Sequence, residues 1–298
     1  MERRTSTLHG VNLTVTEDQK IIGGQEARPH SRPYMAFLNT EAGGGRVRCG
    51  GFLIREDVVV TAAHCNCNWC NITVLLGAHN IAIEEPGRQE IRVRRRIQHP
   101  KFNDETFEND IMLLQLECLA QLNEWVRPIT LPKVTRRVQP GTRCSVAGWG
   151  LTGSDPAKTS DVLMEVELGV KVDKFCTNLY GKGYKSETML CAGSREARQG
   201  TLQGDSGGPL VCDEVAQGIC SWEIVNSSAE IYTRVSHFVP WIKKVIRKGD
   251  SGGLLVCDGV VQGIVSNGDP VGRPPPPSVY TRISKFIPWI NETLQKLS

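Results

Sequence analysis

The chain has 298 residues, a hydrophobic content of 40% and a formal net charge of +3, and its pI is near 8.3. These values are typical of a globular protein with one large or two modest β domains, and they exclude a disordered chain. No apolar run reaches the length of a membrane span, and so small a charge does not indicate a nucleic-acid partner. Eleven cysteines favour an oxidising compartment, and their odd number leaves at least one without an intramolecular partner.

The first twenty residues are a polar N-terminal extension. Met1 to Lys20 contains no apolar core of the kind that a secretory signal peptide needs. Two explanations stay open: a preceding segment is missing from this chain, or this form remains in the cytosol.

From Ile21 onward, short β-type runs alternate with Gly, Pro and Asn turns. Val58–Val60, Ile72–Leu76 and Ile111–Leu114 have the composition of buried strands. The first helical pattern is an apolar stripe from Phe238 to Ile246, with Pro240 near its first turn. Many short strands with one terminal helix predict an all-β fold of antiparallel barrels.

Three short motifs carry the chemistry. They are Thr61–Cys65 around His64, Asn109–Ile111 around Asp110, and Gly204–Pro209 around Ser206. A serine hydroxyl becomes a good nucleophile when an imidazole takes its proton, and that imidazole needs a carboxylate to fix its tautomer. Because all three residue types occur in separate long motifs, we interpret His64, Asp110 and Ser206 as a catalytic triad.

These motifs, together with Ile21–Gly24, resemble the trypsin-like serine proteases. Arg28–Ala36 and Leu76–Asn80 look most like the leukocyte granule branch of that family, which contains the granzymes, cathepsin G and the mast-cell chymases. The resemblance implies two six-stranded antiparallel barrels in one peptidase domain, residues 21–248. It also implies protein or peptide substrates, a monomer without cofactor or metal, and a secreted or granule location.

The same resemblance assigns further roles. The backbone N–H groups of Gly204 and Ser206 would form the oxyanion hole. Cleavage after Lys20 would free the amino group of Ile21, which would pair with Asp205, so the chain as given would be a zymogen. The implied disulfides are Cys49–Cys65, Cys144–Cys212 and Cys176–Cys191.

Substrate preference depends on the residues expected around the pocket. Gly200 stands where trypsin-type members carry an aspartate, and Ser221 and Trp222 resemble the pair that lines the substrate cleft. Glu230 either lies at the pocket floor, as a glutamate does in some branch members, or is a surface residue on an irregular loop. The first interpretation predicts cleavage after aromatic side chains or Leu, with a lesser activity after Lys.

Residues 249–298 depart from the family, because they repeat the end of the peptidase domain. Gly249–Gly253 repeats the serine motif, and Tyr280–Arg282 repeats Tyr232–Arg234. A repeat of about fifty residues is too short to be an independent domain of this architecture. It brings no second histidine or aspartate motif, so Ser251 is an alternative nucleophile for a single centre. We favour the first copy, because it is contiguous with the preceding barrel strands.

Other features leave alternatives open. The family does not account for Cys67, Cys70, Cys118, Cys220 or Cys257; Cys67 and Cys70 form either a local bridge or two thiols. The basic run Arg92, Arg94, Arg95 and Arg96 is either a solvated face or a site for sulfated polysaccharide. Glu223 stands where the family has glycine, and this departure favours an alternative function. In that alternative, the chain is a catalytically weak homologue that binds polyanions or microbial surfaces.

Overall fold

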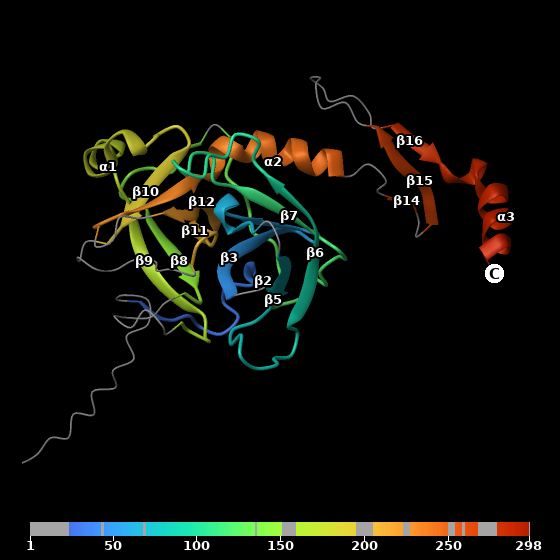
Figure 1. Cartoon of the computed structure of the whole chain (residues 1–298), viewed down its shortest axis with the longest axis horizontal. Coiled ribbons are helices and arrows are strands. Elements are labelled where there is room, and N and C mark those ends of the chain that lie inside the picture. The colour runs from blue at the N-terminus through green and yellow to red at the C-terminus, as the bar shows by residue number, and fades with distance from the viewer. Residues whose placement is uncertain are drawn as a thin grey trace, which may run out of the picture.

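Two six-stranded antiparallel β-barrels lie side by side in the computed structural model, and a three-stranded sheet stands apart from them beyond the end of helix α2 (Figure 1). The structure describes residues 24–42, 45–67, 70–134, 136–150, 159–194, 205–222, 227–249, 254–257, 260–267 and 279–297. The all-β, two-barrel fold predicted from the sequence is confirmed. The predicted domain boundaries at residues 20 and 248 remain predictions.

The first barrel closes in the strand order β2-β3-β4-β7-β6-β5. Its strands are β2 (Met35–Ala42), β3 (Gly45–Arg55), β4 (Val58–Thr61), β5 (Asn71–Leu76), β6 (Gln89–Gln98) and β7 (Met112–Leu116). Each strand turns apolar side chains inward, and Leu38, Phe52 and Val74 are fully buried in the core that results. The run Val58–Thr61 is buried at every position, because this strand is covered on both faces.

The second barrel is built from β8 (Arg143–Gly148), β9 (Met164–Val170), β10 (Met189–Gly193), β13 (Glu230–Arg234), β12 (Val215–Trp222) and β11 (Pro209–Cys212). Each strand in this list pairs with the next one, and β11 also pairs with β8. The pairing of β8 with β9 closes the barrel. Strand β1 (Gln25–Glu26) adds to the outer edge of β9. In the core of this second barrel, Val146, Leu210 and Tyr232 are fully buried.

Three α-helices and three single 3₁₀ turns complete the described elements. The helices are α1 (Asp173–Tyr180), α2 (Val235–Gly249) and α3 (Ile287–Leu297), and the 3₁₀ turns are Ala63–Cys65, Gly181–Gly183 and Ile283–Lys285. Helix α1 was not predicted, because its eight residues are too few to give a helical pattern. Helix α2 begins three residues before Phe238 and contains Pro240 as its sixth residue, not in its first turn.

Four disulfides are present among the described residues. They are Cys49–Cys65, Cys67–Cys70, Cys144–Cys212 and Cys176–Cys191. The second of these is the local bridge, one of the two alternatives that the sequence left open. Cys118 is exposed on the surface, and Cys220 is buried within strand β12. None of the described helices is long and apolar enough to cross a membrane.

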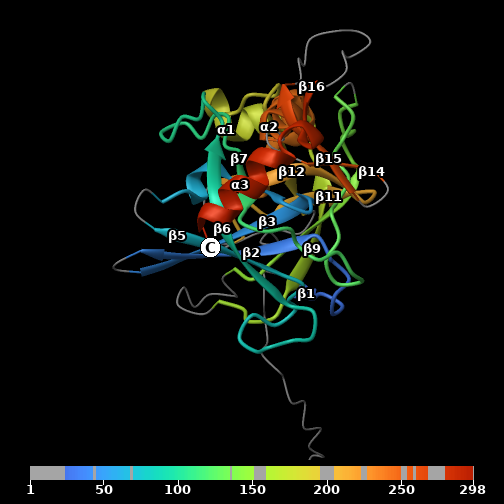
Figure 2. The same ribbon diagram turned by 90° about the vertical axis from the view of Figure 1, so that its right-hand side faces the viewer.

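The separate sheet consists of β14 (Leu254–Cys257), β15 (Val260–Asn267) and β16 (Val279–Arg282), and it leads into α3. Figure 2 views the molecule from the side on which this sheet and α3 lie, so they are in front of the two barrels. The two-barrel fold is complete without them, because both barrels close using strands β2 to β13 alone.

Candidate active site

His64 and Asp110 meet at the end of the first barrel. His64 lies in the 3₁₀ turn that follows β4, and Asp110 lies just before β7, the strand that pairs with β4. The His64 Nδ1 atom is 2.7 Å from Asp110 Oδ2, and the His64 backbone N–H donates to Asp110 Oδ1 at 3.0 Å. This pair of bonds fixes the plane of the carboxylate and leaves Nε2 on the other side of the imidazole ring.

Asp110 is fully buried, so its charge depends on donors from the protein. Ser221 donates its hydroxyl to Asp110 Oδ2 at 2.5 Å, and Thr233 donates to the Asp110 backbone carbonyl at 2.7 Å. Both come from the second barrel, on strands β12 and β13. Ser221 was predicted to bind substrate, and Thr233 was not predicted at all, because no local pattern shows which strand faces a buried carboxylate.

Ser206 is positioned by the tight turn before β11. The Ser206 carbonyl accepts a hydrogen bond from the Gly50 backbone N–H at 2.7 Å, and Gly207 N–H donates to the Cys220 carbonyl at 2.8 Å. Gly207 has φ +85°, and a Cβ at this position would lie 2.2 Å from Thr61 Oγ1 and 3.0 Å from the Ala62 nitrogen. Only glycine allows this approach, which places the serine turn against the segment that leads into His64.

Asp205 occupies a fully buried site behind the serine turn. Its Oδ1 accepts a hydrogen bond from the Gly150 backbone N–H at 2.8 Å. A Cβ on Gly148 would lie 2.0 Å from the same oxygen, and a Cβ on Gly150 would lie 2.7 Å from it. The absence of side chains at Gly148 and Gly150 therefore leaves space for the buried Asp205 carboxylate.

An aromatic wall of ring side chains runs from His64 toward the second barrel. The Phe107 and His64 rings have centroids 5.4 Å apart, the Phe107 and Trp222 rings are 6.5 Å apart, and Trp222 meets Tyr180 edge-on at 5.0 Å. Trp222 was predicted to lie at the substrate cleft. Phe107 was missed, because its position depends on a loop whose backbone turns through positive φ at Phe107 (53°) and Asn109 (58°).

Glu230 is an interior residue of the second barrel. It begins β13, is paired with Ala192 of β10, and its side chain is only 4% exposed. The Tyr232 hydroxyl donates to Glu230 Oε2 at 2.5 Å. The interpretation of Glu230 as a surface residue on an irregular loop is therefore wrong, because its strand lies between β10 and β12 of the second barrel and the carboxylate is buried there.

Several predicted site residues lie outside the described residues. These are Lys20, Ile21, Gly200, Gly204 and Ser251. Glu223, the departure from the family noted in the sequence, lies outside them as well.

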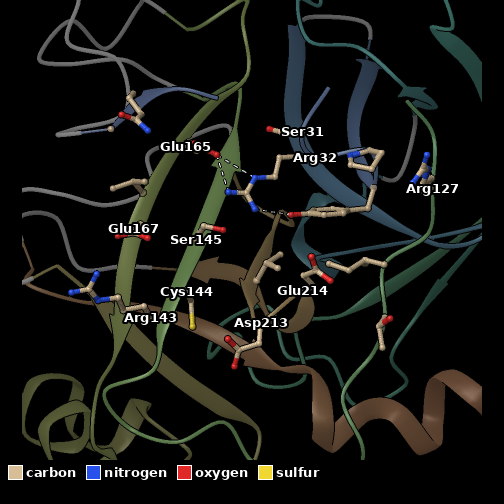
Figure 3. Close-up of a pocket in the computed structure, with 18 of the residues that line it drawn as sticks. Ser31, Arg32, Arg127, Arg143, Cys144, Ser145, Glu165, Glu167, Asp213 and Glu214 are labelled. Carbon is tan, nitrogen blue, oxygen red and sulfur yellow. Dashed lines mark hydrogen bonds and ion pairs between the residues drawn. The ribbon is translucent and has the colours of Figure 1, made fainter. Parts of the chain in front are cut away.

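A polar cavity of about 950 Å³, whose lining does not include His64, Asp110 or Ser206, lies in a groove between the two barrels (Figure 3). Arg32 crosses it and binds Glu165 of β9 at 2.8 Å and the Tyr34 hydroxyl at 3.3 Å. Burial alone would lower the pKa of Arg32, but the neighbouring Tyr34 and Glu165 outweigh it and raise that pKa. This side chain therefore acts as a fixed ionic link across the groove.

Comparison with known proteins places the chain in a family. A family model described as Trypsin matches residues 21–242 and, separately, residues 243–290, and the chain belongs to the trypsin family. Cathepsin G from Homo sapiens is 48% identical over 236 residues, covering 78% of this chain and 90% of the relative. Granzyme B from Homo sapiens is 49% identical over 231 residues, covering 77% and 92%, and duodenase-1 from Bos taurus is 50% identical over 233 residues, covering 78% and 91%.

A solved structure described as "Structure of GrC" has a TM-score of 0.72 and 43% sequence identity, and it covers 76% of this chain and 99% of that chain. The match therefore spans one whole peptidase. The protein is a trypsin-like serine endopeptidase, similar to the granzymes and cathepsin G.

Proposed function

We propose that this endopeptidase hydrolyses peptide bonds with Ser206 as nucleophile, His64 as general base and then general acid, and Asp110 as the group that orients the imidazole. The observation that carries the proposal is the fully buried Asp110 carboxylate bonded to His64 Nδ1. That bond holds the imidazole in the tautomer whose Nε2 can accept a proton from a serine hydroxyl. The tight turn at Gly207 brings the serine motif to the same end of the first barrel.

Reaction with a fluorophosphonate probe tests the nucleophile. We expect the probe to label Ser206, and we expect Ser206→Ala to abolish both labelling and peptide hydrolysis. Ser251→Ala is the matched control, because it removes the equivalent hydroxyl from the repeat, and it should leave both signals unchanged. Labelling at Ser251 would show that the nucleophile is the serine of the repeat. A correctly processed protein with neither labelling nor turnover would favour the catalytically weak, polyanion-binding homologue.

Activation is the second element of the proposal. A fully buried Asp205 carboxylate, with space kept for it by Gly148, is stable when a cation accompanies it. We propose that cleavage after Lys20 supplies that cation as the new amino group of Ile21, which orders the oxyanion loop at Gly204. Asp205→Asn should leave a folded protein whose hydrolysis falls by at least about 100-fold after the cut, because a neutral amide attracts the ammonium far less.

The buried Glu230 supports a mixed preference, with aromatic side chains or Leu favoured and Lys accepted less well. A carboxylate within the second barrel would attract a substrate ammonium, whereas the aromatic wall of Phe107 and Trp222 offers apolar contact. Glu230→Gln keeps an acceptor for the Tyr232 hydroxyl while removing the charge. We expect kcat/KM to fall about 10- to 100-fold for Lys substrates, the size of a lost charge-assisted hydrogen bond, and to change less than about threefold for Phe substrates. Equal losses for both substrates would show that Glu230 acts on the fold.

A polyanion partner is supported by part of the basic run on β6. Arg94 and Arg95 are exposed, but Arg96 donates to the carbonyls of Cys67 and Cys70, so it holds the loop of that disulfide. We propose that Arg94 and Arg95 bind sulfated polysaccharide. Their replacement by Gln should lower the salt concentration that elutes the protein from immobilised heparin, and the same change at exposed Arg136 should not.

Four disulfides and relatives named as granzymes and mast cell proteases support a secreted or granule location.

A further inference from the structure

The turn that carries His64 is held on both sides by side chains of strand β6. Before His64, the Ala63 carbonyl accepts a hydrogen bond from Gln98 Nε2 at 3.0 Å. After His64, the Cys67 carbonyl accepts a hydrogen bond from Arg96 Nη1 at 2.6 Å. Neither Gln98 nor Arg96 belongs to the histidine, aspartate or serine motif, so only the folded chain connects them with the site.

The strand pairing explains how β6 reaches this turn. Strand β7 lies between β4 and β6, and its Met112 pairs with Thr61 of β4 on one side and with Gln98 of β6 on the other. The 3₁₀ turn Ala63–Cys65 follows Thr61 almost directly, and Asp110 precedes Met112 by two residues. The turn, the Asp110 carboxylate and the end of β6 therefore meet at one end of the first barrel.

Arg96 binds both ends of the short loop that the Cys67–Cys70 disulfide closes. Its Nη1 also donates to Asn66 Oδ1 at 3.2 Å, and its Nη2 donates to the Cys70 carbonyl. In the part of the chain that the structure describes, no carboxylate pairs with Arg96, and its oxygen partners are the neutral acceptors of this loop. A guanidinium carries five N–H donors in a fixed planar fork, so it can hold several carbonyl groups at once. The disulfide keeps the Cα atoms of Cys67 and Cys70 5.6 Å apart, within reach of one such fork.

This support matters because the His64 side chain has few contacts of its own. Its imidazole is 22% exposed, and among the described residues its side chain hydrogen-bonds to Asp110 alone. The backbone must therefore supply the rest of its position. The Cys49–Cys65 disulfide fixes the neighbouring residue, and Arg96 fixes the segment that follows. A displacement of about 1 Å in a catalytic group can lower a rate about 100-fold.

We propose that Arg96 and the Cys67–Cys70 disulfide act together to position His64 for catalysis. Arg96 is a positioning residue, because it acts through the loop backbone and not on the reacting atoms. The disulfide contributes by presenting two carbonyl groups to one guanidinium. The inference rests on the proposed role of His64 as general base. It gives a role to two cysteines that the family resemblance does not explain.

Replacing Arg96 with Gln tests the inference in the full chain after cleavage at Lys20. We expect kcat and the rate of fluorophosphonate labelling to fall about 10- to 100-fold, because the imidazole is displaced. KM should change by less than about twofold, because substrate binding is not the function that is lost. Arg96→Lys should lose nearly as much, because an ammonium keeps the charge but not the fork. The double change Cys67→Ala with Cys70→Ala should reproduce the loss without any change of charge.

Arg88→Gln is the matched control, at the other end of β6. Arg88 donates to the Ile83 carbonyl at 2.6 Å, so this variant also loses a bond between an arginine and a loop carbonyl. We expect its labelling rate and kcat to stay at the wild-type level. Thermal unfolding of every variant confirms that the measured protein is folded. Proton NMR follows the hydrogen bond between His64 Nδ1 and Asp110, whose resonance should broaden in the Arg96 variants and remain sharp in the control.

Three results would overturn the inference. The first is wild-type labelling and kcat in both Arg96→Gln and the double cysteine variant. The second is an increase in KM alone, which would show that the loop contacts substrate. The third is an equal loss in Arg88→Gln, which would show that any weakened loop has the same effect. A wild-type chain that is never labelled would refute the proposed function instead, and the NMR resonance would still decide this inference, since an unchanged signal in Arg96→Gln refutes positioning.

Discussion

Replacing Asp110 with Asn tests the proposed catalytic geometry most directly, because the two ends of an amide are chemically different. Asp110 Oδ1 accepts from the His64 backbone N–H, and Oδ2 accepts from the imidazole Nδ1 and the Ser221 hydroxyl. A backbone N–H can only donate, whereas an imidazole can change its tautomer and a hydroxyl can rotate. We therefore expect the oxygen of the introduced amide to face the backbone N–H and its NH₂ group to face Nδ1.

An amide NH₂ at Nδ1 forces the imidazole proton onto Nε2, where it can no longer accept the proton of a serine. We expect kcat to fall roughly 10³- to 10⁴-fold, the size of the effect of a wrong tautomer in such a triad. This loss corresponds to about 4–5.5 kcal/mol in the activation free energy. The free energy of unfolding should fall by only about 1–3 kcal/mol, since the amide retains most of the hydrogen bonds.

Single-turnover hydrolysis of a Phe p-nitroanilide peptide and thermal unfolding together measure both quantities. Thr233→Val is the matched control, because it removes the hydrogen bond to the Asp110 backbone carbonyl but leaves the carboxylate unchanged. It should lower the free energy of unfolding by about 1 kcal/mol and kcat by less than tenfold. A loss below tenfold in the Asp110 variant, or an equal loss in the Thr233 variant, would refute the tautomer argument.

Two further predictions concern stability. Gly148→Ala would place a methyl group 2.0 Å from the buried Asp205 Oδ1 and should lower the free energy of unfolding by about 1–3 kcal/mol, whereas Gly169→Ala has its nearest contact at 3.8 Å and should change it by less than about 1 kcal/mol. Equal melting temperatures would show that the carboxylate can move away. Burial, with smaller contributions from two nearby basic side chains, lowers the pKa of His99 below its ordinary value. The unfolded chain therefore takes up this proton first, and the stability that neutral His99 contributes is lost as pH falls through its lowered pKa. His99→Gln should flatten the decline in melting temperature below about pH 6.5, and an unchanged slope would assign that decline to other groups.

The sequence by itself determined the protein family and the class of fold, and it supplied the three residues of the triad that is proposed above. The motifs around His64, Asp110 and Ser206 are local in the sequence, and the serine motif contains the glycine, Gly207, that its own turn requires. Short apolar runs separated by Gly, Pro and Asn turns predicted barrels, because strands that are covered on both faces are apolar at successive positions. The helix around Phe238 to Ile246 was predicted correctly because apolar residues recur there at helical spacing, whereas the short helix α1 gave no comparable signal.

Tertiary structure alone decided which side chains surround the active site. Glu230 could not be assigned to the interior until strand β13 was placed between β10 and β12, and Phe107 reaches the His64 imidazole only through a loop with positive φ angles. Ser221 and Thr233 lie more than one hundred residues from Asp110 in the chain, yet they bond to it. Likewise, Phe238 and Phe286 occupy equivalent positions in repeated segments, but one is 1% exposed and the other 47%. The physical reason is that burial depends on which surface a segment meets, and that surface is assembled from residues far away in the sequence.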